Sequence, residues 1–199
     1  MPFKVRCSTQ SIYHGPLWCH LNEMDIKKRF WHSFKAGDCV LDAGHGYGAY
    51  CLPAAALGAE AWAIDPIGTD DEYLAFKLTC EANGMFGGRM HMVRGFLAAK
   101  GGERDFNGRK LDVYTVDELD RPFTHINLDT EGAELEILQG AERTLREHKP
   151  FIILENHLFI DADCEKKHDA FLFGLGVGYE KLASIVEGTC THSAYRAPR

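Results

Sequence analysis

Short apolar runs alternate with helix-like stretches along most of the chain. Five runs have the length of buried strands and end at charged or turn-forming residues; they lie at 39–43, 60–64, 89–94, 125–129 and 151–155. The spacing of apolar residues predicts helices over 49–57, 71–83, 132–147 and 163–174. Two further strands are predicted near 179–186 and 190–196. Nearly continuous apolar strands that alternate with helices indicate a mostly parallel sheet covered by helices on both faces.

Two segments lack this alternation. Residues 98–110 contain Gly101-Gly102 and Asn107-Gly108, which predict a surface loop. Residues 1–38 are rich in aromatic residues and histidine but carry no clean strand pattern, and we expect helices or irregular structure over 22–34. We therefore divide the chain into an N-terminal segment, 1–38, and a domain, 39–199. The segment could form a lid over a bound ligand, or a helix that packs its aromatic side chains on the sheet.

The composition narrows the class of protein. The 199 residues carry a net charge of −7, which disfavours a duplex nucleic acid as partner because phosphate neutralisation needs clustered Lys and Arg. No apolar run approaches the roughly 20 residues that span a bilayer, and the first residues do not resemble a secretory signal. The seven cysteines form no CxxC pair. We expect a cytoplasmic protein with reduced thiols.

A glycine-rich turn follows the first predicted strand. The turn begins at Asp42 and contains Gly44, His45, Gly46 and Gly48, and Asp65 ends the next strand. Glycines let the backbone approach a ligand, and an acid at the second strand can accept hydrogen bonds from ribose hydroxyls. The pattern fits a dinucleotide or S-adenosylmethionine. The carboxylate of Asp42 favours S-adenosylmethionine, because it would repel a pyrophosphate. A plain glycine-rich turn remains the alternative.

A second cluster of acids follows the strand at 125–129. Asp129 and Glu131 come directly after it, and Glu134 lies one turn into the next helix. Carboxylates at a helix N-terminus are stabilised by the helix dipole, so capping would explain them. If the sheet is doubly wound, these acids would also lie beside the glycine turn. Their mutual repulsion would then raise at least one pKa, as a general base requires.

These segments together resemble the FkbM family of S-adenosylmethionine-dependent methyltransferases. The resemblance covers about 39–199, and its distinctive part is LDTEGAELEILQGA followed by PFIILEN. The chain departs from the family at Asn127, where a Lys is usual, at Asp65, where Glu is more frequent, and at His45 in the glycine turn. The resemblance implies a Rossmann-like class I methyltransferase fold with a seven-stranded sheet.

The resemblance also implies a reaction. S-adenosyl-L-methionine would donate a methyl group to a hydroxyl on a sugar or secondary-metabolite acceptor, hence a small molecule or glycan. Asp42, Gly44, His45, Gly46, Gly48 and Asp65 would bind this cofactor. The proton of the hydroxyl would pass to Asp129, Glu131 or Glu155, with His157 as an alternative base. Glu155 and His157 are two residues apart, so a regular strand places both side chains on one side.

Other readings stay open. An NAD(P)-dependent oxidoreductase would share the glycine turn but leave the acidic signature unexplained, and a non-catalytic cofactor-binding module would not need the acids. A nucleic-acid methyltransferase would carry an Asn/Asp-Pro-Pro-Tyr loop, which the sequence lacks. A Mg²⁺ ion on Asp129, Glu155 and His157 is conceivable but not favoured, and neither Cys164/His168 nor Cys190/His192 has zinc-site spacing, so we assign no metal. Because 1–38 is short for the family, a homo-oligomer could complete the pocket.

Overall fold

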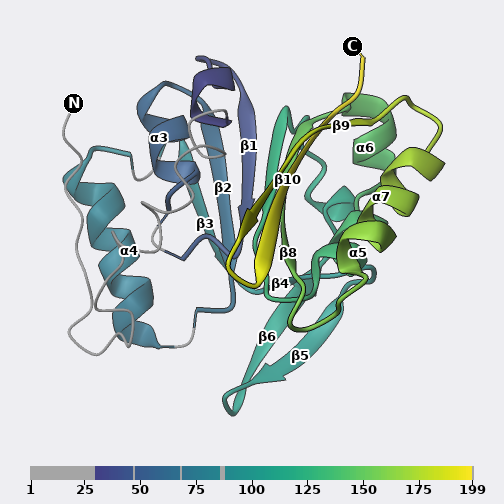
Figure 1. Ribbon diagram of the computed structural model, residues 1–199. Coiled ribbons are helices and arrows are strands. Elements are labelled where there is room, and N and C mark those ends of the chain that lie inside the picture. The colour runs from purple at the N-terminus through teal and green to yellow at the C-terminus, as the bar shows by residue number, and fades with distance from the viewer. Residues whose placement is uncertain (1–29, 47, 68, 86–87, 199) are drawn as a thin grey trace.

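A seven-stranded sheet forms the centre of the protein. The structure is a computed structural model that describes residues 30–46, 48–67, 69–85 and 88–198 (Figure 1). Its strands follow the order β3-β2-β1-β7-β8-β10-β9. Their bounds are β1 (Cys39–Ala43), β2 (Glu60–Asp65), β3 (Met90–Arg94), β7 (His125–Leu128), β8 (Phe151–His157), β9 (Glu180–Glu187) and β10 (Cys190–Arg196). Six of these strands run in one direction, and β10 runs against them between β8 and β9. The prediction of a mostly parallel seven-stranded sheet is confirmed.

Helices cover both faces of the sheet. One group comprises α3 (Cys51–Ala56) and α4 (Asp70–Ala82), and the other comprises α5 (Glu134–Gln139), α6 (Glu142–His148) and α7 (Cys164–Gly174) (Figure 1). Alternate residues of a strand point to opposite faces of the sheet and pack in different clusters. Leu41 belongs to the core cluster that contains Leu138 of α5, whereas Val40 packs in a cluster with Phe30. This alternation explains why the strands read as continuous apolar runs.

The described part of the N-terminal segment packs against the sheet. Residues 30–33 are helical, and Phe30 is fully buried, with ring centroids 4.9 Å from Tyr50 and 4.7 Å from Phe34. These contacts are those of a helix that packs aromatic side chains on the sheet. The rest of the proposed lid, residues 1–29, lies outside the described residues.

The prediction of a surface loop over 98–110 is wrong. A second sheet has the order β4-β6-β5, from β4 (Phe96–Leu97), β5 (Gly102–Phe106) and β6 (Arg109–Tyr114). Asn107 and Gly108 join β5 to β6 with positive φ angles of 54° and 75°, as a two-residue hairpin turn requires. All but the last residue of β5 are exposed, so the strand lacks the apolar alternation by which strands are found in a sequence. A 3₁₀ helix, η1 (Asp117–Leu119), follows.

The helix predicted over 132–147 is two helices. The first, α5, ends before Gly140, and α6 begins at Glu142. A Cβ atom on Gly140 would lie 2.2 Å from the carbonyl oxygen of Ala98. Glycine therefore permits the segment after β4 to approach the helix pair closely, and the hydrophobic periodicity continues across the break. Among the described residues, no helix has the length and apolar character needed to cross a membrane.

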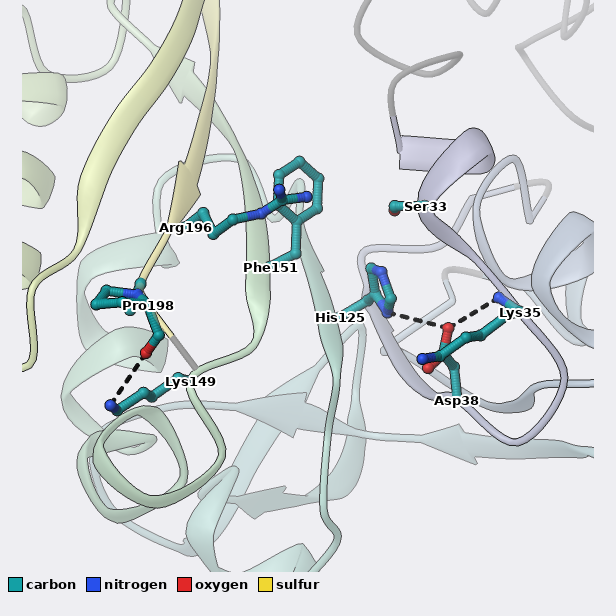
Figure 2. A pocket seen from close by; sticks show the side chains of 9 residues that line it. Ser33, Lys35, Asp38, His125, Lys149, Phe151, Arg196 and Pro198 are labelled. Carbon is teal, nitrogen blue, oxygen red and sulfur yellow. Dashed lines mark hydrogen bonds and ion pairs between the residues drawn. The ribbon is translucent and has the colours of Figure 1, made fainter.

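The two edges of the central sheet differ in their cavities. At the edge where β7 and β8 begin, a cavity of about 390 Å³ is lined by His125, Phe151, Asp38 and three cationic side chains, Lys35, Lys149 and Arg196 (Figure 2). At the opposite edge, where the parallel strands end, a cavity of about 210 Å³ lies beside His157 and Glu134. We call these the amino edge and the carboxyl edge.

Candidate active site at the carboxyl edge

The glycine turn contacts the acidic segment directly. Gly44 has a φ of 74°, and a Cβ atom at this position would lie 1.7 Å from the carbonyl oxygen of Asp129. The backbone N–H of Asp129 also donates to the carbonyl of Ala43 at 3.0 Å. Any side chain at residue 44 would force the two segments apart. The two sequence motifs therefore meet at one edge of the sheet.

Asp42 is buried beneath the turn and both of its carboxylate oxygens are engaged. One oxygen accepts a hydrogen bond from the backbone N–H of Cys51 at 2.9 Å, and the other accepts from the side-chain amide of Asn127 at 2.9 Å. The first bond fixes the start of α3, and the second joins β1 to β7. Asn127, which stands where the family usually has Lys, thus serves as a neutral donor to a buried acid.

Asp65 joins the far side of the turn to the end of β2. Its two oxygens accept hydrogen bonds from the backbone N–H groups of Gly46, at 3.3 Å, and Ile67, at 2.8 Å. His45 is buried, its ring 4.2 Å from that of Phe76, and its Nδ1 lies 2.9 Å from the Gly46 carbonyl. The predicted cofactor residues therefore lie in one loop, the turn between β1 and α3, or contact it from the ends of β1 and β2.

Glu134 organises the acidic segment. Its carboxylate accepts hydrogen bonds from the Thr130 N–H at 2.9 Å, the Thr130 hydroxyl at 3.1 Å and the Gly132 N–H at 3.1 Å. Burial alone would raise the pKa of Glu134, but His157 and these backbone donors hold it below its usual value. Glu131 lies within the same turn at a φ of 53°, with its side chain exposed. The turn is therefore shaped by Glu134 and leaves Glu131 at the surface.

His157 lies among three carboxylates. Its Nε2 is 3.7 Å from Oδ1 of Asp129 and 3.6 Å from Oε1 of Glu155, and its Nδ1 is 3.4 Å from Oε1 of Glu134. Burial alone would lower the pKa of His157, but Glu134, Glu155 and Glu131 outweigh it and raise the pKa. The structure thus brings Asp129, Glu155 and His157 together, while Glu131 contributes only through its charge.

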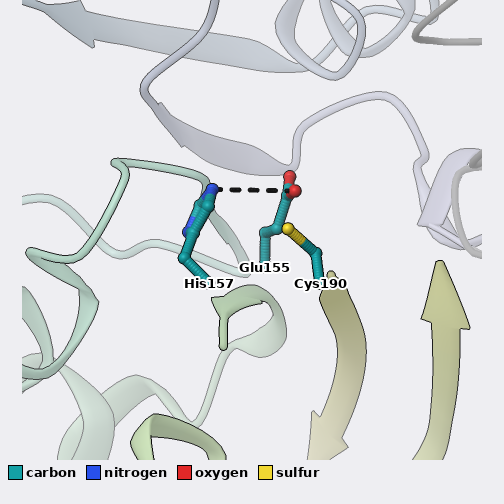
Figure 3. A group of neighbouring side chains, drawn as sticks. All are labelled: Glu155, His157 and Cys190. Carbon is teal, nitrogen blue, oxygen red and sulfur yellow. Dashed lines mark ion pairs between the residues drawn. The ribbon is translucent and has the colours of Figure 1, made fainter. Parts of the chain in front are cut away.

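Cys190 completes this group, and the sequence analysis did not assign it to the site. It lies opposite His157 in the antiparallel pairing of β8 with β10, next to Glu155 (Figure 3). Burial, and then the carboxylate of Glu155, raise the pKa of its thiol to about 12. The signal that could have found it is topological: a final strand that returns beside β8 must begin at the carboxyl edge.

The rim of the smaller cavity is partly apolar. Phe159 and Ile160 follow β8, with exposed fractions of 62% and 51%, and the ring of Phe159 packs edge-on against His157 at 5.6 Å. Ile160 also lines the cavity, together with Cys164 of α7. Exposed apolar side chains next to a charged cluster suit a ligand that presents both a carbon surface and a polar group.

Comparisons with solved structures show the fold. A methyltransferase FkbM from Methylobacillus flagellatus superposes with a TM-score of 0.68 at 18% identity, covering 82% of this chain and 44% of that protein. A precorrin-6y C5,15-methyltransferase from Geobacter metallireducens gives 0.60 at 13% identity and covers 88% of each chain. A ribosomal protein L11 methylase from Lactobacillus delbrueckii gives 0.56 at 16% identity, covering 88% and 78%. The chain thus spans less than half of the M. flagellatus protein, and the class I methyltransferase fold is confirmed.

The sequence comparison identifies the family. No curated protein matches the chain. The pattern of the methyltransferase FkbM domain matches residues 53–181, which is more than half of the sequence and includes both the acidic segment and β8. The resemblance found in the sequence is confirmed: the chain belongs to the FkbM methyltransferase domain family.

Proposed function

We propose that this protein transfers the methyl group of S-adenosyl-L-methionine to a hydroxyl of a small-molecule or glycan acceptor. The observation that carries the proposal is the contact between Gly44 and Asp129, because it places a glycine-rich loop beside a cluster of potential bases. In sheets of this kind, ligands bind at the carboxyl edge, between the strands where the order reverses. Here β1 and β7 are those strands, and both motifs follow them.

The cofactor would lie over the glycine turn. Asp65, at the end of β2, is placed to accept hydrogen bonds from ribose hydroxyls once it releases the Gly46 N–H. Asp42 would act indirectly, since its carboxylate already holds Cys51 and Asn127 and thereby sets the shape of the turn. The bound cofactor supplies an activated methyl group, and the protein aligns the acceptor oxygen with it and excludes water.

The acidic group would take the proton. The acceptor oxygen forms a bond to the methyl carbon as the carbon–sulfur bond breaks, and the hydroxyl proton passes to a carboxylate, so S-adenosylhomocysteine and the methyl ether are released. Asp129 and Glu155 are better placed than the exposed Glu131, because both face His157 at the edge that the glycine turn contacts. A positioned base contributes about 10²–10⁴-fold to such a step. His157, whose pKa is raised, would hold the Asp129 and Glu155 carboxylates in position through its positive charge.

Two measurements test the proposal. Isothermal titration should detect binding of S-adenosylhomocysteine and no binding of NAD. The reverse result would support an oxidoreductase. Binding of S-adenosylhomocysteine without methyl transfer to any acceptor would support a non-catalytic module. Transfer of labelled methyl groups to a panel of sugars, phenols and polyketide alcohols should then reveal the acceptor class. Methylation of RNA or DNA in place of these would overturn that class.

Single amide variants assign the base. Asp129→Asn should reduce turnover by about 10²-fold or more while the affinity for S-adenosylhomocysteine changes less than about threefold, because the carboxylate acts in the chemical step. Glu155→Gln, Glu131→Gln and His157→Gln form the series. Glu142→Gln, on the exposed face of α6, is the control. Full turnover in all four site variants would show that the base lies elsewhere.

A further inference from the structure

A mixed set of donor groups lies at the carboxyl edge. Glu155 and His157 come from the end of β8, and Cys190 comes from the start of β10 (Figure 3). A carboxylate oxygen, an imidazole nitrogen and a thiol sulfur from these three residues all lie within 4.8 Å of one another. Cys190 is far from the other two residues in the sequence, and the return of β10 beside β8 brings its thiol to them.

The imidazole and carboxylate of this group are separated as two ligands of one ion would be. The Nε2 of His157 lies 3.6 Å from Glu155 and 3.7 Å from Asp129, which is longer than an ordinary hydrogen bond. Donors held about 2.0–2.3 Å from a tetrahedral zinc ion are themselves about 3.3–3.8 Å apart. The carboxylate and the imidazole are thus already at ligand spacing, and the thiol sulfur, which lies within 4.8 Å of both, would complete the set by a movement of the Cys190 side chain toward them.

A carboxylate also lies on the other side of His157, where metal-binding histidines donate an outer hydrogen bond. Its Nδ1 faces the carboxylate of Glu134 at 3.4 Å, and Glu134 is in turn fixed by the Thr130 and Gly132 N–H groups. His157 Nδ1 makes no hydrogen bond to any residue that the structure describes, and a small movement of the ring toward Glu134 would form the bond that orients the ring and leaves Nε2 for the metal. His157 is 5% exposed and Glu134 is 1% exposed, so neither is a casual surface contact.

We propose that Glu155, His157 and Cys190 bind a divalent ion of the zinc class, with one position left open toward Asp129. Nitrogen and sulfur donors select zinc or cobalt over magnesium, which prefers oxygen. An ion here would replace the proton of the Cys190 thiol, and the positive charge that remains would offset one of the two neighbouring carboxylates, those of Glu155 and Asp129.

The role of the ion rests on the proposed function. An acceptor hydroxyl in the open position would be acidified by the ion, and Asp129 would be the carboxylate that takes its proton. Glu155 would then be a ligand and not a base. Binding of the methyl donor and binding of the ion are separate events. Either the proposed function or the proposed metal site can therefore be disproved without the other.

Cobalt provides a readout that does not depend on turnover. Tag-free, metal-stripped full-length protein should bind one equivalent of Co²⁺ and show thiolate-to-cobalt charge-transfer absorption, which Zn²⁺ abolishes and excess Mg²⁺ does not. Cys190→Ser should remove the absorption, and His157→Gln and Glu155→Gln should weaken binding at least tenfold. Cys39→Ser, which changes a buried free cysteine at the start of β1 and hence at the opposite end of the sheet, is the matched control and should behave as the unchanged protein does.

Two results would overturn the proposal. One is charge-transfer absorption that persists in a folded Cys190→Ser protein, and the other is displacement of Co²⁺ by Mg²⁺ as readily as by Zn²⁺. If Cys190→Ser does not fold, X-ray absorption of the zinc-loaded unchanged protein decides, since it must contain one sulfur at about 2.3 Å. Titration with S-adenosylhomocysteine, performed separately, reports on the methyl-donor site.

Discussion

The two edges of the sheet present opposite chemistry. At the amino edge, Lys35, Lys149 and Arg196 line the larger cavity, and local partners occupy two of them: Lys149 donates to the Pro198 carbonyl at 3.0 Å, and Arg196 lies over the Phe151 ring at 5.2 Å. At the carboxyl edge, carboxylates gather around His157 beside a smaller cavity. The edge that we propose to be reactive is therefore the one with the smaller cavity. The proposal follows from the closely spaced acids and their contact with the glycine turn, not from cavity volume.

The largest expected effect contrasts one glycine from each edge. Gly44→Ala should abolish detectable binding of S-adenosylhomocysteine and destabilise the fold by at least about 3 kcal/mol, because the new Cβ meets the Asp129 carbonyl at 1.7 Å. Gly37 at the amino edge also has a positive φ, 87°, but no atom lies within 4 Å of its Cβ position. Gly37→Ala should cost only about 1–2 kcal/mol and preserve binding. Thermal melting and calorimetry compare the two.

If both variants behaved alike, strain from the positive φ and not the contact with Asp129 would govern the turn. The contrast between the edges would then lose its main support.

A smaller effect concerns a carboxylate that belongs to neither edge. Glu165 of α7 is bound by Lys181 at 3.0 Å and by hydroxyls of Ser184, Ser193 and Thr191. Burial would raise its pKa, but these donors lower it to about 2 from 4.5. Because the folded pKa is the lower one, this stability is present above about pH 4.5 and is lost as the pH falls toward 2.

Glu165→Gln should therefore reduce stability at pH 6 by on the order of 2 kcal/mol and flatten the loss of stability below pH 4.5. Urea unfolding at a series of pH values measures this. Glu142→Gln, which removes an exposed pair with Arg146, serves as control and should leave the slope unchanged. An unchanged slope for Glu165→Gln would mean that the acid dependence arises in other carboxylates, those of the carboxyl edge included.

The smallest effect is expected at Lys149. This residue ends α6 with a φ of 47°, where glycine is unstrained. Lys149→Gly relieves that strain, but it removes an exposed hydrogen bond and increases the conformational entropy of the unfolded chain. The net change in the free energy of unfolding should therefore stay within about 0.5 kcal/mol. The affinity for S-adenosylhomocysteine should not change. A shift larger than threefold, measured by calorimetry, would connect the amino edge to cofactor binding.

The local hydrophobic pattern was sufficient to predict the strands of the central sheet and the helices that cover it, because burial of the strands on both faces demands apolar runs. It failed for β5, which is exposed and charged, and for the break at Gly140, which depends on the approach of Ala98. Short helices and hairpins of this kind are decided by tertiary contacts.

The candidate site divides in the same way. Asp129, Glu155 and His157 were predicted because each follows or ends a parallel strand. The partnership of Asp42 with Asn127 and the position of Cys190 were not, because they depend on which strands become neighbours and in which register. The role of each site residue stays a prediction, as do the lid over 1–38, an oligomer that completes the pocket, and the cytoplasmic location.

Like every strand of the central sheet, β10 has one end at each edge, but its opposite direction places its first residue at the carboxyl edge and its last at the amino edge. Cys190 faces the acids near His157, and Arg196 reaches the cationic cavity. A slip of this strand by one residue would withdraw the sulfur from one end and the guanidinium from the other at the same moment. A substitution that alters the pairing of β10 should therefore change both surfaces together.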